Sequence, residues 1–187
     1  MKGGLRTCSL TIAVVSATAL ITGASLLYPG ILLALQRSPA ALGAGQVWRF
    51  ITPLFVERGG WKEIAFNLVS LIAVGILAER LWGKRRWVIF YLTGGVTGQA
   101  CGLAWRPIGA GSSVAMCGLL GACAVWALPR RASWLAVLAG LAIVMGVVLT
   151  IMHNLHGPPL LAGALAAGLA TRSPEEQPDH ATRRKTT

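Results

Sequence analysis

Residues 109–122 read GAGSSVAMCGLLGA, a glycine-rich turn followed directly by an apolar segment of small residues. Two adjacent serines, Ser112 and Ser113, stand where the apolar segment begins. Glycine and alanine let helix backbones approach closely inside a membrane. The stretch therefore predicts a tightly packed helix that carries a pair of hydroxyl groups at its N-terminus.

The composition of the whole chain is that of a membrane protein. Of the 187 residues, 55% are apolar, 12% are charged and 23 are glycine, an apolar excess over ordinary soluble domains. Apolar runs comparable with a spanning helix lie near 9–28, 63–82, 87–105, 113–128, 132–151 and 157–171. We therefore predict an all-α membrane protein, with six transmembrane helices in one domain over residues 1–171. A polar tail, 172–187, is expected to be disordered.

The first apolar run has an alternative interpretation as a cleaved signal peptide, because the basic segment MKGGLR precedes it. Its apolar region is longer than the roughly 7–15 residues usual in signal peptides. No clear small-x-small cleavage site follows it. We therefore expect residues 9–28 to be retained as the first helix.

Lysine and arginine are distributed unevenly between the two sides of the membrane that the six predicted helices would span. With a cytoplasmic N-terminus, 12 of the 17 basic residues fall on the inner side and five on the outer side. Basic residues are retained in the cytoplasm, so both termini are expected there. Contact with anionic lipid accounts for the net charge of +11, and no nucleic-acid partner is expected. We expect a multi-pass protein of a bacterial cytoplasmic membrane, and the oligomeric state stays open.

Several polar side chains are expected at one depth near the outer face. From Ser113 to Leu128 the fourth span rises by roughly 22 Å, which is short of the hydrocarbon core of about 30 Å. Ser113 should therefore lie in a hydrated cavity below the outer surface, because lipid cannot satisfy the amides of the preceding loop. Glu63 and Asn67 share one face of the second helix, and His156 precedes the sixth. Polar groups at this depth indicate a functional site.

These groups suit nucleophilic acyl transfer. A serine hydroxyl needs a neighbouring base, and the pKa of histidine suits that task near neutral pH. The backbone N–H of Ser113 at a helix N-terminus and the side-chain amide of Asn67 are candidate donors to an oxyanion. No acid is obviously placed to orient His156, which favours a dyad. The four cysteines show no metal-like spacing, and neither a metal nor an organic cofactor is expected.

Five motifs follow one another along most of the chain. They are WRFITPLF at 48–55, Asn67 as in HxxxN, Gly75 to Gly83 as in GxxxExxxG, GSSVAMCGLLGA as in GxSGxxxGLLGA, and His156 with Gly163 seven residues later. In this order they resemble the rhomboid intramembrane serine proteases. The resemblance implies hydrolysis of a peptide bond in or beside a transmembrane segment of a membrane-protein substrate. The cavity would open to the outer side, and a rhombosortase-like subclass is a related possibility.

The resemblance also implies roles for the matched polar residues. Ser113, between Gly111 and Gly118, would be the nucleophile, and His156 would be the general base. Asn67 and the N–H of Ser113 would stabilise the oxyanion.

Other matched residues would be structural. Trp48 and Arg49 would belong to a loop in the outer leaflet, and Glu79 with Arg80 to the scaffold near the cytoplasmic face.

The neighbouring polar and small residues are given simpler roles. A contact between Gly118 and Gly163 would bring the outer ends of the fourth and sixth helices together. Ser112 is expected to be a cap or loop hydroxyl, His153 to lie in interfacial water, and Asn154 to form a turn.

The chain departs from the family pattern at three positions, and two of these, Glu63 and Val114, favour a second hypothesis. Val114 replaces the glycine after the serine, Glu63 replaces the histidine of HxxxN, and Glu57 stands where another loop histidine is common. Glu63 and Val114 are therefore possible modulators of activity. The alternative function is a non-catalytic rhomboid-like pseudoprotease that binds membrane clients. A small transporter is a third hypothesis, for which the expected paired repeats with interrupted helices are not visible.

Overall fold

The computed structural model describes residues 8–129 and 134–172, and the expected all-α architecture is confirmed there. The elements in chain order are α1 (Ser9–Leu27), α2 (Pro29–Leu35), α3 (Pro39–Gly43), η1 (Val47–Phe50), η2 (Thr52–Phe55), α4 (Trp61–Trp105), α5 (Ser113–Ala127), α6 (Trp134–Ile151) and α7 (Gly157–Arg172). The two η elements are short 3₁₀ helices. Within the described residues, each predicted apolar run overlaps a helix or one half of α4, and residues 132 and 133 of the fifth run lie outside them. The predicted tail beyond Arg172 lies outside the described residues.

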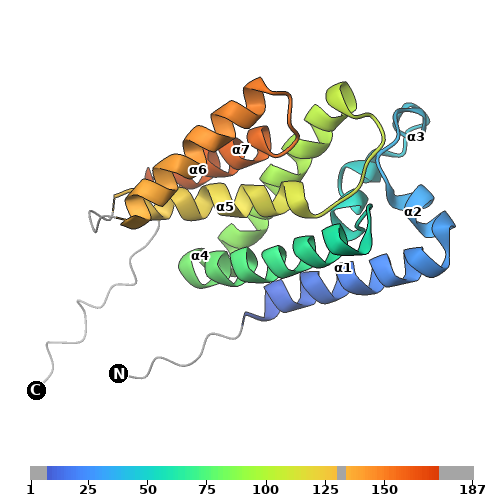
Figure 1. Cartoon of the computed structure of the whole chain (residues 1–187), viewed down its shortest axis with the longest axis horizontal. Coiled ribbons are helices and arrows are strands. Elements are labelled where there is room, and N and C mark those ends of the chain that lie inside the picture. The colour runs from blue at the N-terminus through green and yellow to red at the C-terminus, as the bar shows by residue number, and fades with distance from the viewer. Residues whose placement is uncertain (1–7, 130–133, 173–187) are drawn as a thin grey trace, which may run out of the picture.

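The long helix α4 covers the second and third predicted spans and changes direction between them (Figure 1). The interruption is Gly83, whose φ of 74° lies in the left-handed region that favours glycine. On the second half, Trp87 donates its Nε1–H to the carbonyl oxygen of Gly75 on the first half at 3.0 Å. This bond ties the two halves together across the kink.

Helix α1 is attached to the first half of α4 by a buried acid. The carboxylate of Glu79 accepts hydrogen bonds from the N–H groups of Leu10 and Thr11 at 3.2 and 2.8 Å and from the Thr11 hydroxyl at 2.7 Å. First-turn N–H groups have no partner within their own helix, so Glu79 caps α1 from its neighbour. Gly75 permits this approach, since a Cβ there would lie 2.6 Å from Thr11 Cγ2. Arg80, by contrast, is exposed.

Three helices meet at a cluster of glycines in the middle of the bundle. A Cβ added to Gly118 of α5 would lie 2.8 Å from the Cα of Gly94 on α4. On the other side, a Cβ at Gly163 of α7 would collide with the Gly118 carbonyl oxygen. The expected contact between Gly118 and Gly163 is therefore present. It aligns α5 and α7 so that their N-terminal ends lie close together.

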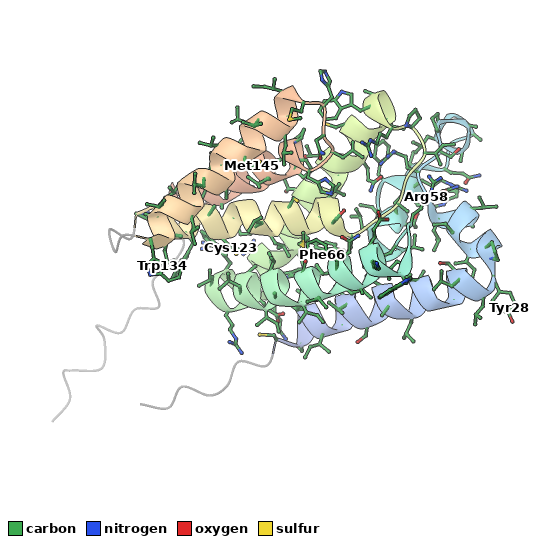
Figure 2. All side chains as sticks on the ribbon, viewed as in Figure 1. Tyr28, Arg58, Phe66, Cys123, Trp134 and Met145 are labelled. Carbon is green, nitrogen blue, oxygen red and sulfur yellow. The ribbon has the colours of Figure 1, made fainter. Side chains whose placement is uncertain are left out.

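The outside of the bundle is strongly apolar. Phe66, Trp134 and Met145 point away from the helices and are 69%, 64% and 54% exposed (Figure 2). Among the described helices, α1, α4 and α6 are long and apolar enough to cross a membrane, and α5 and α7 are shorter apolar helices. Soluble proteins rarely expose contiguous apolar surfaces of this extent. The molecule is therefore built to be surrounded by lipid.

The connection between α1 and α4 contains short helices that the sequence analysis did not predict. It contains α2, α3, η1 and η2, which lie near the C-terminal end of α1 (Figure 1). The guanidinium of the buried Arg49 donates to the carbonyl oxygens of Leu33 and Gln36, both at 2.8 Å, and to Gln46 Oε1 at 2.7 Å. Trp48 is 54% exposed on the same loop. Arg49 thus joins several turns of the connection through their main chain.

Candidate active site

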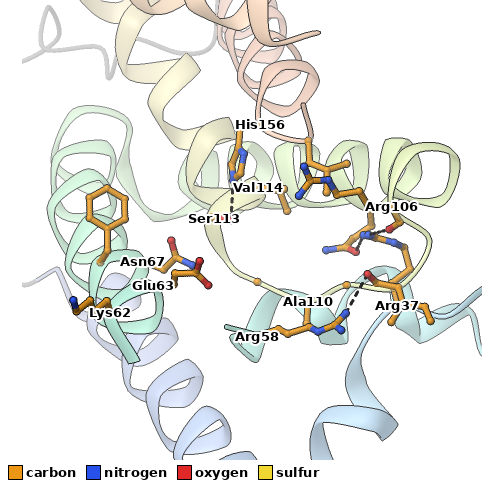
Figure 3. A pocket seen from close by; sticks show the side chains of 16 residues that line it. Arg37, Arg58, Lys62, Glu63, Asn67, Arg106, Ala110, Ser113, Val114 and His156 are labelled. Atoms are coloured by element: carbon orange, nitrogen blue, oxygen red, sulfur yellow. Dashed lines mark hydrogen bonds between the residues drawn. The ribbon is translucent and has the colours of Figure 1, made fainter. Parts of the chain in front are cut away.

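Ser113 and His156 are brought together from two different helices. Ser113 is the first residue of α5, and His156 immediately precedes α7. The Ser113 Oγ lies 3.1 Å from the His156 Nε2 (Figure 3). The turn before Ser113 depends on Gly111, which has a φ of 148° and donates its N–H to the Pro53 carbonyl at 2.9 Å. Its backbone therefore adopts a conformation that other residues rarely reach.

Asn154 holds the other side of the imidazole. The Asn154 Oδ1 accepts the backbone N–H of His156 at 3.0 Å and lies 2.8 Å from its Nδ1. Because this oxygen is an acceptor, Nδ1 carries the ring proton and Nε2 presents its lone pair to Ser113. The sequence analysis predicted only a turn at Asn154 and missed this contact. The available signal was a carboxamide two residues before the histidine, within reach of its ring.

His153 points elsewhere. Its ring packs edge-on against Trp105 with centroids 5.2 Å apart, and the residue is exposed. Its positive φ of 56° turns the chain between α6 and Asn154. Ser113 is therefore paired with His156 and not with this neighbouring histidine.

A cavity of about 610 Å³ opens beside Ser113 (Figure 3). Six residues singled out from the sequence line it: Gly111, Ser113, His156, Asn67, Glu63 and Val114. They come from α4, the turn before α5, α5 itself and the turn before α7. The tertiary structure thus gathers them around one space.

A buried acid, Glu57, connects Asn67 of α4 with the residue that precedes Ser113. Its Oε2 accepts Asn67 Nδ2 at 2.7 Å, and its Oε1 accepts the backbone N–H of Ser112 at 2.9 Å as well as the Ser112 hydroxyl. Ser112 is fully buried and occupies the N-cap position of α5, yet its hydroxyl bonds to Glu57 and not to the helix. The sequence analysis noted Glu57 only as a departure from the family and missed both contacts.

The two departures that line the cavity are accommodated locally. Val114 is 6% exposed and packs against Gly98 of α4, where an added Cβ would lie 2.5 Å from the Val114 Cβ. Glu63 is exposed, and its carboxyl group lies against Gly59, whose φ is 142°. The valine therefore fits because Gly98 has no side chain, and the Glu63 carboxyl is turned toward the loop before α4.

Most of the charged residues that line the cavity are basic. Its charged residues are Arg37, Arg58, Lys62, Arg106 and Glu63. Burial lowers the pKa of His156 below its ordinary value, and the positive charge of Arg106 lowers it further. His156 is therefore neutral near pH 7. Within residues 8–129 and 134–172, no three His, Cys, Asp or Glu side chains are grouped to hold a metal ion.

Fold and site together define a class: an integral membrane protein of packed helices with a serine–histidine pair beside a cavity. The Rhomboid domain matches residues 44–170, most of the chain, which contain both members of this pair. The chain belongs to the rhomboid family, as its motifs predicted.

Two relatives from Bacillus subtilis (strain 168) share part of the sequence. The rhomboid protease GluP is 36% identical over 95 residues, which are 50% of this chain and 18% of GluP. The protein YdcA, also named for the rhomboid family, is 31% identical over 80 residues, 41% of this chain and 40% of YdcA. The chain therefore matches less than half the length of either relative.

Proposed function

We propose that this protein is an intramembrane serine endopeptidase that cleaves a peptide bond in or next to a transmembrane segment of a membrane-protein substrate. The observation that carries the proposal is the 3.1 Å separation between Ser113 Oγ and His156 Nε2 at the wall of a cavity that polar side chains also line. A serine within hydrogen-bond reach of a neutral imidazole is the arrangement that activates a hydroxyl for attack.

In the first half of the reaction, Ser113 Oγ attacks the substrate carbonyl carbon while His156 Nε2 accepts the hydroxyl proton. The resulting imidazolium is stabilised by Asn154, whose Oδ1 accepts the Nδ1–H. Collapse of the tetrahedral intermediate breaks the C–N bond, and His156 returns the proton to the leaving amine. An acyl group then remains on Ser113.

In the second half, water from the cavity attacks the acyl carbon. His156 accepts one proton from this water and gives it to the departing Ser113 Oγ, which restores the free enzyme. Both tetrahedral intermediates carry a negative oxygen. The free N–H of Ser113 at the start of α5 and the Asn67 amide are the donors that stabilise it.

The proposed substrate is a transmembrane protein that enters the site from the bilayer. Its helix must partly unwind, because a helical carbonyl is already bonded within its own chain. The cavity is proposed to face the outer side of a bacterial cytoplasmic membrane, with both termini inside. This orientation is supported by the excess of lysine and arginine in the segments that would lie in the cytoplasm.

The test compares wild type with Ser113→Ala and His156→Ala in proteoliposomes that contain a transmembrane reporter. Loss of the nucleophile or the base is expected to reduce the cleavage rate by roughly 10⁴-fold or more. A fluorophosphonate probe should label wild type and not Ser113→Ala. Unchanged cleavage by Ser113→Ala would refute the assignment.

A second candidate function is client binding without catalysis. It is favoured by negative charge near the oxyanion position, because Glu57 bonds directly to Asn67 and Glu63 lines the cavity. A carboxylate repels a developing oxyanion. Wild type that captures a transmembrane client but neither cleaves it nor reacts with the probe would support this function.

A further inference from the structure

Glu57 is a charged residue in an unusually enclosed place. It lies in the connection between η2 and α4, and only 3% of its surface is exposed. Its backbone N–H donates to Thr22 Oγ1 of α1 at 3.0 Å, which anchors the residue to a neighbouring helix. A charged group is rarely buried unless hydrogen bonds satisfy it. The partners of its carboxylate therefore indicate what the burial serves.

The first carboxylate oxygen holds the turn that precedes the nucleophile. Glu57 Oε1 accepts the Ser112 N–H at 2.9 Å and the Ser112 hydroxyl. Ser112 is fully buried and immediately precedes Ser113 in the chain. These two bonds fix the backbone at the N-terminus of α5, where the free N–H of Ser113 begins the helix.

The second carboxylate oxygen fixes the orientation of Asn67. Glu57 Oε2 accepts one N–H of the Asn67 carboxamide at 2.7 Å. A carboxylate only accepts hydrogen bonds, so it selects the nitrogen end of the carboxamide and not the oxygen end. The carboxamide nitrogen has a second N–H, which this bond leaves available to a substrate oxygen.

We propose that Glu57 is a positioning residue for the oxyanion site. One carboxylate holds both Asn67 and the turn before Ser113, so that their N–H groups are directed at one substrate oxygen. The inference rests on the protease function proposed above. The family's HxxxN motif has a histidine one turn before the asparagine, but here that position is Glu63, which lies against Gly59. Glu57 reaches Asn67 from the loop instead.

The negative charge of Glu57 also repels the oxyanion. This repulsion opposes the benefit of holding the oxyanion donors in place. The basic wall of the cavity offsets part of this repulsion through Arg37, Arg58, Lys62 and Arg106. Oxyanion donors act through preorganised geometry, and a displacement of about 1 Å can slow a reaction by about 10²-fold. We expect the loss of orientation to outweigh the relief of repulsion when Glu57 is replaced.

The experiment measures kcat and KM of Glu57→Gln and Glu57→Ala with the transmembrane reporter, together with the rate of fluorophosphonate labelling. Glutamine keeps the size of the side chain but directs an NH₂ group at one of the present donors, so at least one bond is lost. Both variants are expected to lose roughly 10- to 100-fold in kcat and labelling rate. KM should change little, because the carboxylate contacts Ser112 and Asn67 and not the substrate.

Glu79→Gln is the matched control for removing a buried carboxylate. Glu79 is 5% exposed and also accepts three hydrogen bonds, but all come from α1 and none from the site. This variant is expected to lower Tm while kcat stays close to wild type. A comparable kcat loss in Glu79→Gln would mean that the Glu57 effect is general destabilisation, and it would overturn the inference.

A double-mutant cycle separates positioning from a merely structural role. If Glu57 acts through Asn67, Glu57→Ala should slow the Asn67→Ala variant much less than it slows wild type. The inference would be overturned if Glu57→Ala reduced kcat by the same factor in wild type and in the Asn67→Ala variant. A Glu57→Gln variant as fast as wild type or faster would overturn it as well. In those cases, cleavage that still depends on Ser113 would leave the proposed function intact. If wild type neither cleaves nor reacts with the probe, the protease function fails and the positioning role fails with it.

Discussion

The imidazole of His156 is constrained at both of its nitrogens. Asn154 Oδ1 lies 2.8 Å from Nδ1, and Ser113 Oγ lies 3.1 Å from Nε2. Burial lowers the pKa of His156, and the charge of Arg106 lowers it further. A base must be neutral to accept a proton, so a lowered pKa would keep the proposed base competent at a pH below the ordinary pKa of histidine.

Replacing Arg106 by glutamine should move the acid limb of the pH profile. Activity falls as the pH drops through the pKa of His156, because protonated imidazole cannot act as a base. Removing the positive charge raises that pKa, so the acid limb of kcat/KM should shift to higher pH. The shift should be partial, since burial is the larger cause and stays in place.

The control for this measurement is Arg58→Gln. Arg58 also lines the cavity, but its charge is not a cause of the lowered pKa of His156. The acid limb of kcat/KM for Arg58→Gln should coincide with that of wild type. An acid limb that stays in place or moves to lower pH in Arg106→Gln would contradict the electrostatic argument.

At the scale of elements, α5 is packed between α4 and α7 through backbone contacts. Gly118 lies against Gly94 on one side and Gly163 on the other, so the helices approach without intervening side chains. Ser113 and His156, the proposed reacting groups, lie at the N-terminal ends of α5 and α7. Their separation therefore depends on how closely these two helices pack.

Gly163→Val should disrupt the site without altering any polar group. The added Cβ would collide with the Gly118 carbonyl oxygen, and overpacking of this kind costs about 1–3 kcal/mol. Moving α7 away from α5 separates His156 from Ser113. We expect a lower Tm and a loss of fluorophosphonate labelling.

Gly168→Val is the matched substitution on the same helix. A Cβ at Gly168 meets nothing within 4 Å, so labelling should remain near wild type. If Gly163→Val were labelled as fast as Gly168→Val, close packing of α5 on α7 would not be what holds the dyad together.

At the scale of the whole molecule, the cavity and the kink of α4 lie at opposite ends of the first half of that helix. Arg58 lines the cavity just before α4 begins, and Lys84 follows the interruption at Gly83. Both residues are exposed. With the orientation proposed from the distribution of lysine and arginine, we expect Arg58 on the outer side and Lys84 in the cytoplasm.

A membrane-impermeant maleimide should distinguish these two ends in intact cells. In a background with Cys101→Ala, Arg58→Cys should react with the maleimide in intact cells. Lys84→Cys should react only after the cells are permeabilised. The three other cysteines are buried and should give little background. The reverse pattern would show that the cavity faces the cytoplasm.

The amino-acid sequence determined the parts that depend on local pattern. Apolar runs located the helices because each must cover its backbone polar groups within one segment. The motifs singled out Ser113, His156 and Asn67, since such residues are costly in an apolar helix and stand out there. Small residues that permit close helix approach also suggested the contact between Gly118 and Gly163.

Only the tertiary structure decided how polar residues from separate segments pair. Glu57 is 10 residues from Asn67 and 55 from Ser112, and no periodicity of a helix relates positions so far apart through a loop. The Val114 side chain fits because Gly98, on another helix, leaves space for it. Asn154 is near His156 in sequence, but the bond to its ring depends on the conformation of a turn. These contacts are set by how the chain closes in three dimensions, and they determine the geometry around Ser113.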